Sequence, residues 1–148
     1  MNPGSGPLAY FTADHRACDA LWSEIESAAN AEDRSKIEKL WCDFDKAMRH
    51  HFDMEEQVLF PALEDAMNMH GGGPTAVMRS EHVQMRAVLD QMAGDASRGA
   101  MDALIDDGDT LLMLIQQHNA KEEGMLYPMA DARLRPAWGE LAARLAKV

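Results

Sequence analysis

The chain has 148 residues, of which 47% are hydrophobic and 26% charged, and its formal net charge is -11. This length fits one domain, expected over residues 1–148, and the apolar content excludes a disordered chain. Nucleic-acid binding is not expected, because an acidic surface repels phosphate backbones. No run of about 18 apolar residues is present, so no membrane span is expected.

The start of the chain and the cysteines bear on the cellular compartment. Residues 1–8 contain neither a basic segment nor an apolar run, so no signal peptide is expected. Cys18 and Cys42 are too few for a disulfide framework and indicate free thiols in a reducing environment. We therefore expect a cytoplasmic protein, in which Cys18 is a small residue of the apolar core.

Apolar residues recur at steps of three and four in four segments, at about 11–29, 37–62, 78–96 and 104–125. This spacing is the helical period. The breaks at 31–33, 71–74 and 94–99 are short, and short connections make successive helices antiparallel. The sequence therefore predicts an all-α fold: an up-down-up-down four-helix bundle whose core covers about 8–130.

Individual residues refine the expected helix boundaries. Thr12 is expected as the cap or in the first turn of the first helix, and Pro74 in the first turn of the third. Pro61 and Pro128 should kink or end the second and fourth helices. Gly108 is expected to make room for a bulky side chain such as Trp41.

A shorter amphipathic segment follows Pro136. Trp138, Leu141 and Leu145 recur at helical spacing, which predicts a C-terminal helix at about 136–147. This helix would either cap the bundle or support a dimer contact, and we favour capping. The oligomeric state stays open between monomer and homodimer.

The most informative feature is a motif that occurs twice. The pattern H-x-x-x-E-E-x-x-L-[FY]-P covers residues 51–61 and again 118–128, which lie 67 residues later. The same shift relates His15 to His82. The chain is therefore a duplicated unit, in which a segment with one His precedes a segment with His and Glu four apart.

This repeat supplies six candidate metal ligands. On a helix, residues four apart share one face, so each His-x-x-x-Glu pair can reach one centre. All six lie on apolar stripes, where an unpaired polar group is destabilising. Six donors exceed one tetrahedral zinc site but suit two metals, each with two His, joined by two carboxylates. The candidates are His15, His51, Glu55, His82, His118 and Glu122.

The order of these ligands, with LFP or LYP after the glutamates, resembles the hemerythrin family, specifically bacterial single-domain HHE cation-binding domains. The resemblance covers about residues 8–130. It implies a four-helix bundle with a non-haem centre of two iron ions of the Fe–O–Fe type, and O₂, NO or peroxide as the small ligand. By position, the first two histidines would bind one iron and the last two the other, with Glu55 and Glu122 as bridges.

One departure from the oxygen-carrying hemerythrins stands out. Those proteins have a second His one turn after the third-helix His, whereas this chain has Arg86 there. His50 is rotated away from the site and His70 falls near the central loop, so neither should fill the gap. A nearly symmetric centre with two His per metal has open positions, which favours reaction with small oxidants over O₂ transport.

Residues beside the ligands carry further expectations. Glu81, next to His82, is expected either as an extra ligand or as a hydrogen-bond partner behind a ligand. Glu56 and Glu123 point outward on a regular helix and are expected in solvent or behind the ligands. Tyr127 is expected as a packed aromatic residue.

Three functions fit such a centre. The first is a binding or sensing module for O₂ or NO. The second is an iron-dependent oxidoreductase that decomposes peroxide, or a protein that repairs iron–sulfur clusters, with the metal as redox centre and Lewis acid. The third is a structural divalent-cation domain, with zinc or manganese as alternative metals. The sequence assigns no catalytic residue and leaves enzymatic activity open.

Overall fold

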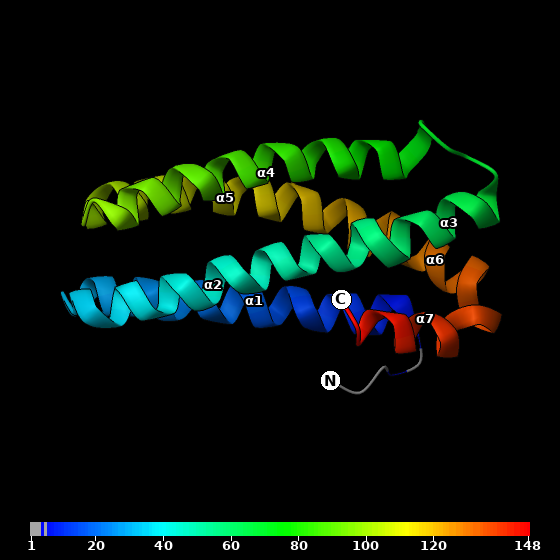
Figure 1. The fold of residues 1–148 in the computed structure, drawn as a ribbon, viewed down its shortest axis with the longest axis horizontal. Coiled ribbons are helices and arrows are strands. Elements are labelled where there is room, and N and C mark those ends of the chain that lie inside the picture. Colours follow the sequence, from blue (N-terminus) through cyan, green and yellow to red (C-terminus); the bar gives the residue numbers. More distant parts are fainter. Residues whose placement is uncertain (1–3, 5) are drawn as a thin grey trace.

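The computed structural model describes residues 4 and 6–148, and four long helices form its body. These helices are α1 (Pro7–Asn30), α2 (Arg34–Met54), α4 (Gly73–Ser97) and α5 (Met101–Lys121). One hairpin is made by α1 and α2 and the other by α4 and α5, and the two lie side by side (Figure 1). The described part of the chain contains no strand, so the predicted all-α four-helix bundle is confirmed.

Local side-chain chemistry sets the helix ends. Asp33 caps α2 by accepting a hydrogen bond from the backbone N–H of Lys36 at 3.2 Å. The predicted break at 94–99 is wrong in extent, because α4 continues to Ser97 and only residues 98–100 form the turn. Buried Asp95 bonds to Arg98 at 2.7 Å, and Gly99 then takes the left-handed conformation with φ of 67°.

The start of α1 differs from the prediction. The helix begins at Pro7, and Thr12 lies inside it with its hydroxyl oxygen buried and without a hydrogen-bond partner. Proline suits the first turn of a helix, since its missing N–H would have no partner there anyway. Pro74 takes the same place in α4, as expected.

Each copy of the motif contains a π-helical turn. Segment η1 covers Glu55–Leu59 and η2 covers Glu122–Leu126. The backbone N–H of Phe60 bonds to the carbonyl of Glu55, five residues back. In a regular helix the ring of Pro61 would clash with the carbonyl four residues before it, and the wider turn relieves that clash. The prolines therefore do not end the helices.

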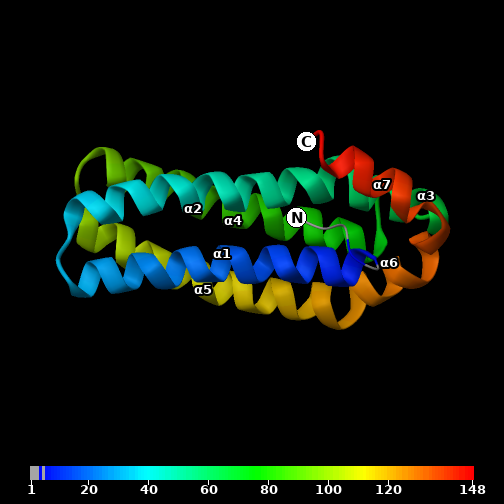
Figure 2. The same cartoon turned by 90° about the horizontal axis from the view of Figure 1, so that it is seen from below.

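Helical structure continues beyond both prolines and then folds back over the bundle end. These continuations are α3 (Phe60–Met67) and α6 (Tyr127–Leu134), followed by η3 (Arg135–Ala137) and α7 (Trp138–Leu145). The predicted C-terminal helix is thus observed, two residues shorter at each end. Its apolar residues Trp138, Leu141 and Leu145 are buried, and α7 packs against η1. Figure 2 shows α7 at the same end of the bundle as α3 and α6.

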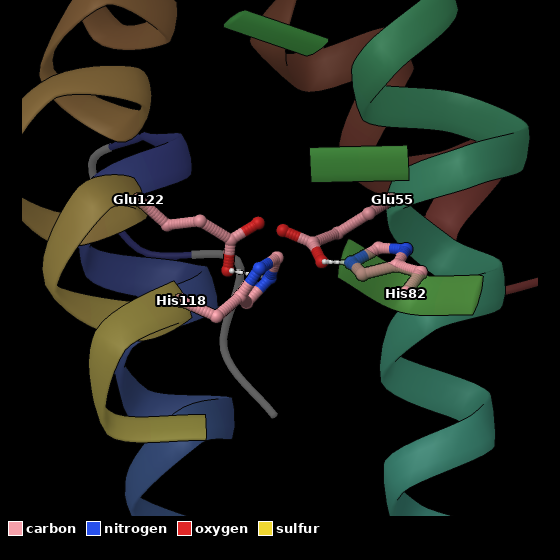
Figure 3. A group of neighbouring side chains, drawn as sticks. All are labelled: Glu55, His82, His118 and Glu122. Carbon is pink, nitrogen blue, oxygen red and sulfur yellow. Dashed lines mark ion pairs between the residues drawn. The ribbon is translucent and has the colours of Figure 1, made fainter. Parts of the chain in front are cut away.

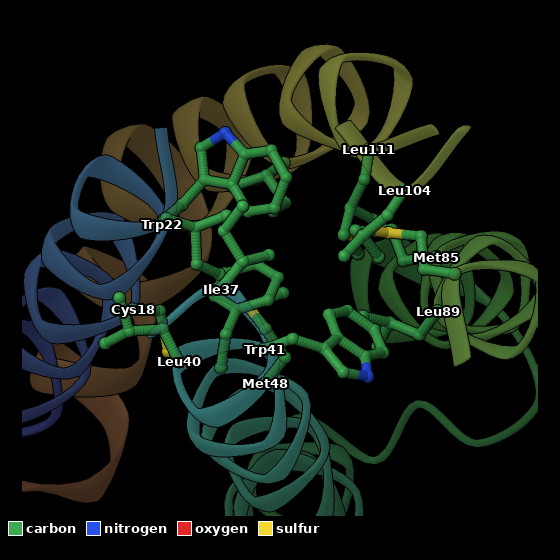
Figure 4. Close-up of a cluster of buried hydrophobic side chains, with 14 of the residues drawn as sticks. Cys18, Trp22, Ile37, Leu40, Trp41, Met48, Met85, Leu89, Leu104 and Leu111 are labelled. Atoms are coloured by element: carbon green, nitrogen blue, oxygen red, sulfur yellow. The ribbon is translucent and has the colours of Figure 1, made fainter. Parts of the chain in front are cut away.

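Two apolar cores flank the middle of the bundle. The long-helix core lies between the four long helices (Figure 4) and contains Cys18, Trp22, Ile25, Ala28, Ile37, Leu40, Trp41, Phe44, Met48, Phe52, Met85, Leu89, Met92, Leu104, Leu111 and Ile115. The end core lies under α3, α6 and α7 and contains Phe11, Met54, Val58, Leu59, Phe60, Leu63, Met78, Leu126, Tyr127, Ala130, Leu134, Trp138, Leu141 and Leu145. Along α1, His15 falls between the two cores, which positions the site there.

Gly108 does admit a bulky neighbour, but the neighbour is Trp22 and not Trp41. A Cβ atom at residue 108 would lie 1.9 Å from Cη2 of the Trp22 ring, far inside van der Waals contact. The absent side chain therefore lets α5 pass directly over the indole.

Candidate metal centre

Four buried histidines, one from each long helix, converge between the two cores. His15, His51, His82 and His118 are at most 4% exposed. Glu55 and Glu122, the first residues of the two π-helical turns, are 0% exposed. Each glutamate lies one turn after a histidine, so α2 with η1 and α5 with η2 each present a His and a Glu to the same point.

The two carboxylates lie between the histidine Nε2 atoms. Nε2 of His82 is 3.1 Å from Oε1 of Glu55, and Nε2 of His118 is 3.1 Å from Oε1 of Glu122 (Figure 3). On the other side, His15 Nε2 is 3.0 Å from Glu122 and His51 Nε2 is 3.3 Å from Glu55. Each carboxylate therefore faces one histidine of each hairpin, which is the position of a bridge.

Close packing divides the donor atoms into two overlapping groups. Donor atoms of Glu55, His82, His118 and Glu122 all lie within 4.8 Å of one another. Donor atoms of His15, His51 and Glu122 do so as well, and Glu122 belongs to both groups. All six sequence-predicted residues are thus brought together, in two overlapping groups that could each hold a cation.

A carboxylate holds the other ring nitrogen of every one of these histidines. Nδ1 contacts an acid at 2.7 Å in His15, 2.6 Å in His51, 2.6 Å in His82 and 2.9 Å in His118; the acids are Glu123, Asp14, Glu56 and Glu81 respectively. With Nδ1 engaged, Nε2 is the nitrogen that faces the centre, and each ring is fixed in orientation. Glu81 therefore stands behind His118 and does not join the inner cluster.

Surface cations complete the support of three of these acids. Arg16 contacts Glu123 at 2.6 Å, and Lys121 pairs with Glu81. Arg86, which occupies the place of the additional histidine, points outward to Asp53 at 2.9 Å and Glu56 at 3.4 Å. Among the described residues, four histidines line the centre.

Several inner atoms are buried without a satisfied hydrogen bond. They are Oε1 of Glu55, Nε2 of His82, Nε2 of His118 and Oε2 of Glu122. Three of them, Oε1 of Glu55 and Nε2 of His82 and His118, take part in the approaches of about 3 Å given above, which lack hydrogen-bond geometry. Buried polar atoms left in this way are destabilising, and cations placed among them would satisfy all four. This donor set of imidazoles and carboxylates suits iron and other first-row divalent metals.

Burial and neighbouring negative charges have opposite effects on the pKa values of the histidines. Burial lowers the pKa of His15 to about 4, which keeps its imidazole neutral. For His51 burial also acts to lower the pKa, but the charge of Glu55 and the hydrogen bond that the ring donates to Asp14 outweigh it and raise the pKa well above its usual value. The pKa of Glu55, which burial alone would raise, is held well below its usual range by His51.

Tyr127 also reaches the centre. The sequence predicted only a packed aromatic ring here, whereas the hydroxyl group contacts both glutamates of the site. The Oη atom lies 2.7 Å from Glu55 Oε2 and 2.9 Å from Glu122 Oε1. In a regular helix, Tyr127 would be rotated by about 140° around the helix axis relative to Glu122, five positions earlier. The π turn after Glu122 removes most of this rotation. The signal in the sequence was the proline at 128, which forces the wider turn.

A small apolar cavity of about 10 Å³ borders three of the histidines. Its walls include Cys18, Met48, Met85 and Ile115. This volume holds about one water-sized molecule. Burial raises the pKa of the Cys18 thiol to about 12, so the thiol stays protonated and serves as an apolar wall.

The remaining histidines lie outside the centre. Nε2 of His50 approaches the carbonyl of Val148 at 3.3 Å, and His70 pairs with Asp65 at 3.2 Å near the central loop. Among residues 4 and 6–148, no helix combines the length and apolarity needed to cross a bilayer.

The fold and the candidate site together define a class: a four-helix bundle with a buried cluster of imidazoles and carboxylates in its interior that could hold a cation. Comparison with protein families gives the same result, since the hemerythrin HHE cation-binding domain matches residues 6–130. The chain belongs to this family. Comparisons with curated proteins and with solved structures gave no significant match.

Proposed function

We propose that the domain holds two iron ions and uses them to bind or react with a small oxidant, O₂, NO or peroxide. His15 and His51 would hold one iron, and His82 and His118 the other. Glu55 and Glu122 would bridge them. The observation that carries the proposal is the convergence of four carboxylate-backed imidazoles on two buried carboxylates with unsatisfied atoms.

The chain's residues have separate tasks in this proposal. The histidines bind through Nε2, and the acids on Nδ1 orient the rings and raise their basicity. The two cores exclude water from both ends of the centre. When bound, two irons would supply a redox pair and Lewis acidity for a small oxygen or nitrogen ligand.

The surroundings favour a very small reactant. The apolar cavity beside His15, His51 and His118 offers about 10 Å³, which suits a molecule of two or three atoms and excludes an organic substrate. Its walls include Cys18, Met48, Met85 and Ile115, and Asp19 is the charged residue among them. Binding and peroxide reaction are both compatible with this cavity, and no residue is assigned as catalytic.

Metal analysis tests the proposal directly. Protein expressed with added iron is expected to contain close to two irons per chain and to absorb in the visible range, with a spectrum that changes on adding azide or peroxide. Glu55→Gln should lose most of the iron, because it removes a bridging charge. His70→Gln should retain it, because that histidine is 59% exposed and lies outside the centre.

Contrary results would be equally clear. Zinc in place of iron with a featureless visible spectrum would favour the structural-cation alternative. Iron binding with no response to azide or peroxide would refute the oxidant chemistry and leave only a metal-stabilised bundle. Peroxide turnover by the iron protein, absent in Glu55→Gln, would favour the enzymatic alternative over simple binding.

A further inference from the structure

The two copies of the motif differ at one position that reaches the centre: Phe60 in the first copy corresponds to Tyr127 in the second. Both rings follow a π turn and lie over a ligand. The Phe60 ring stacks on His82 with centroids 5.5 Å apart, and the Tyr127 ring lies 5.4 Å from that of His15. Only Tyr127 carries an oxygen, and its side chain is completely buried.

The Tyr127 hydroxyl completes a triangle of donor atoms. Its oxygen is 3.1 Å from His15 Nε2 and 2.9 Å from Glu122 Oε1, and those two atoms are 3.0 Å apart. Metal–ligand bonds of about 2.1 Å that meet at right angles separate their donor atoms by about 3 Å. The triangle therefore has the dimensions of one face of an octahedral coordination sphere.

A second histidine nitrogen and the other carboxylate extend this arrangement. The Tyr127 oxygen is 3.5 Å from His51 Nε2 and 2.7 Å from Glu55 Oε2. A hydroxyl donates only one hydrogen bond, yet four potential partners surround this one. A cation bound by the hydroxyl oxygen and by these neighbouring atoms would explain why so many potential acceptors surround one hydroxyl.

The opposite half of the centre has no such oxygen. The inner Nε2 atoms of His82 and His118 are each 3.1 Å from one carboxylate oxygen and have no hydrogen-bond partner. The residue equivalent to Tyr127 is Phe60, whose ring offers no donor atom. Arg79 covers that ring from outside, with its guanidinium carbon 5.4 Å from the centroid.

We propose that Tyr127 is a seventh protein ligand, which binds the metal between His15 and His51 through its hydroxyl oxygen. Phenolate oxygen is an established iron ligand in haem proteins, and its proton would be released to solvent as the metal binds. The two metal positions are then unequal, and the His82/His118 position keeps one more place open for a small molecule. This inference rests on the proposed two-iron centre.

Ferric iron makes the proposal testable, because a coordinated phenolate gives a visible charge-transfer band and resonance-enhanced tyrosinate vibrations. The oxidised iron protein should show both, and Tyr127→Phe should lose both. Phe60→Tyr, which places a second phenol at the equivalent position, should increase the band about twofold. Tyr10→Phe is the matched control, since Tyr10 is the chain's only other tyrosine and its hydroxyl contacts Met54 Sδ at 3.6 Å.

Metal titration gives an independent measurement. Wild-type protein should bind its two metals in two resolved steps, and Tyr127→Phe should narrow the difference between their affinities by about tenfold or more. Two irons per chain without a tyrosinate signal, or an unchanged signal in Tyr127→Phe, would overturn the role of Tyr127 and leave the two-iron centre intact. A wild-type chain that binds no iron would overturn both proposals.

Discussion

The long-helix core and the metal centre are buried equally deeply, yet they hold the bundle together by different means. Leu89 and Leu104 in the core are 0% exposed, and so are Glu55 and Glu122 in the centre. Burial of leucine is favourable in itself, whereas a buried carboxylate needs a compensating charge. The core should therefore stabilise the fold under all conditions, and the centre only when its charges are matched by bound cations.

Truncating the apolar core should produce the largest effect and should do so with or without metal. Leu104→Ala is expected to lower the free energy of unfolding by about 2–5 kcal/mol, because it leaves a cavity among the four helices. Urea unfolding of the metal-loaded and metal-free protein measures this. Met113→Ala on the same helix is the control, since Met113 is 63% exposed and its loss should change stability by less than about 0.5 kcal/mol.

Removing the metal should affect the centre alone. Metal at a concentration about a thousandfold above its Kd stabilises the folded state by about 4 kcal/mol. A chelator should remove this stabilisation and so lower the melting temperature. Glu122→Gln should abolish this dependence on chelator. If the variant and wild type lost the same stability on chelation, the metal would be bound elsewhere.

Weakening the acids behind the histidines should have an intermediate effect. Asp14→Asn and Glu81→Gln are equivalent changes in the two halves, behind His51 and His118. Each is expected to lower metal affinity by about 10- to 100-fold, because the imidazole becomes less basic and less firmly oriented. Competition with a chromophoric chelator gives the affinities. Unchanged affinity in both variants would refute the supporting role of these acids.

Lowering the pH should weaken metal binding without damage to the apolar core. Burial acts to lower the pKa of His51 and His82, but neighbouring carboxylates outweigh it. The charge of Glu55 and the hydrogen bond to Asp14 raise the pKa of His51, and the close approach of Glu55 and the hydrogen bond to Glu56 raise that of His82. A metal ion that binds through Nε2 must displace any proton on that nitrogen, and a raised pKa extends the pH range in which the proton competes. Below these raised pKa values, affinity should fall about tenfold per pH unit for each displaced proton. Calorimetry in buffers of different ionisation enthalpy should detect the released protons.

Removing an outer cation should have the smallest effect. Arg16 is 57% exposed, and its pairing with Glu123 is open to solvent. Arg16→Ala is expected to change stability by less than about 1 kcal/mol and metal affinity by only a few-fold. A loss as large as that of Asp14→Asn would show that the outer cations are needed to hold the acids in place.

Much of this arrangement could be predicted from the sequence, because helical periodicity and the 67-residue repeat are local and regular. The four helices, the C-terminal helix and the convergence of the six site residues all follow from which positions share a helix face. The break at 94–99 was predicted too wide, since composition alone does not reveal that Asp95 is buried and bonded to Arg98. Gly108 was expected to face Trp41, but helix rotation in the packed bundle brings Trp22 over it.

What the sequence determined by itself is therefore the type and order of the helices and the set of histidines and glutamates on their inner faces. The tertiary structure alone decided which acid supports which histidine, because those contacts join residues on different helices. It also decided the position of Tyr127, since a proline-induced π turn shifts the helical phase by an amount that regular periodicity does not contain. The pattern of apolar and polar residues specifies which residues share a helix face, and only the packing of the helices specifies which residues of different helices are in contact.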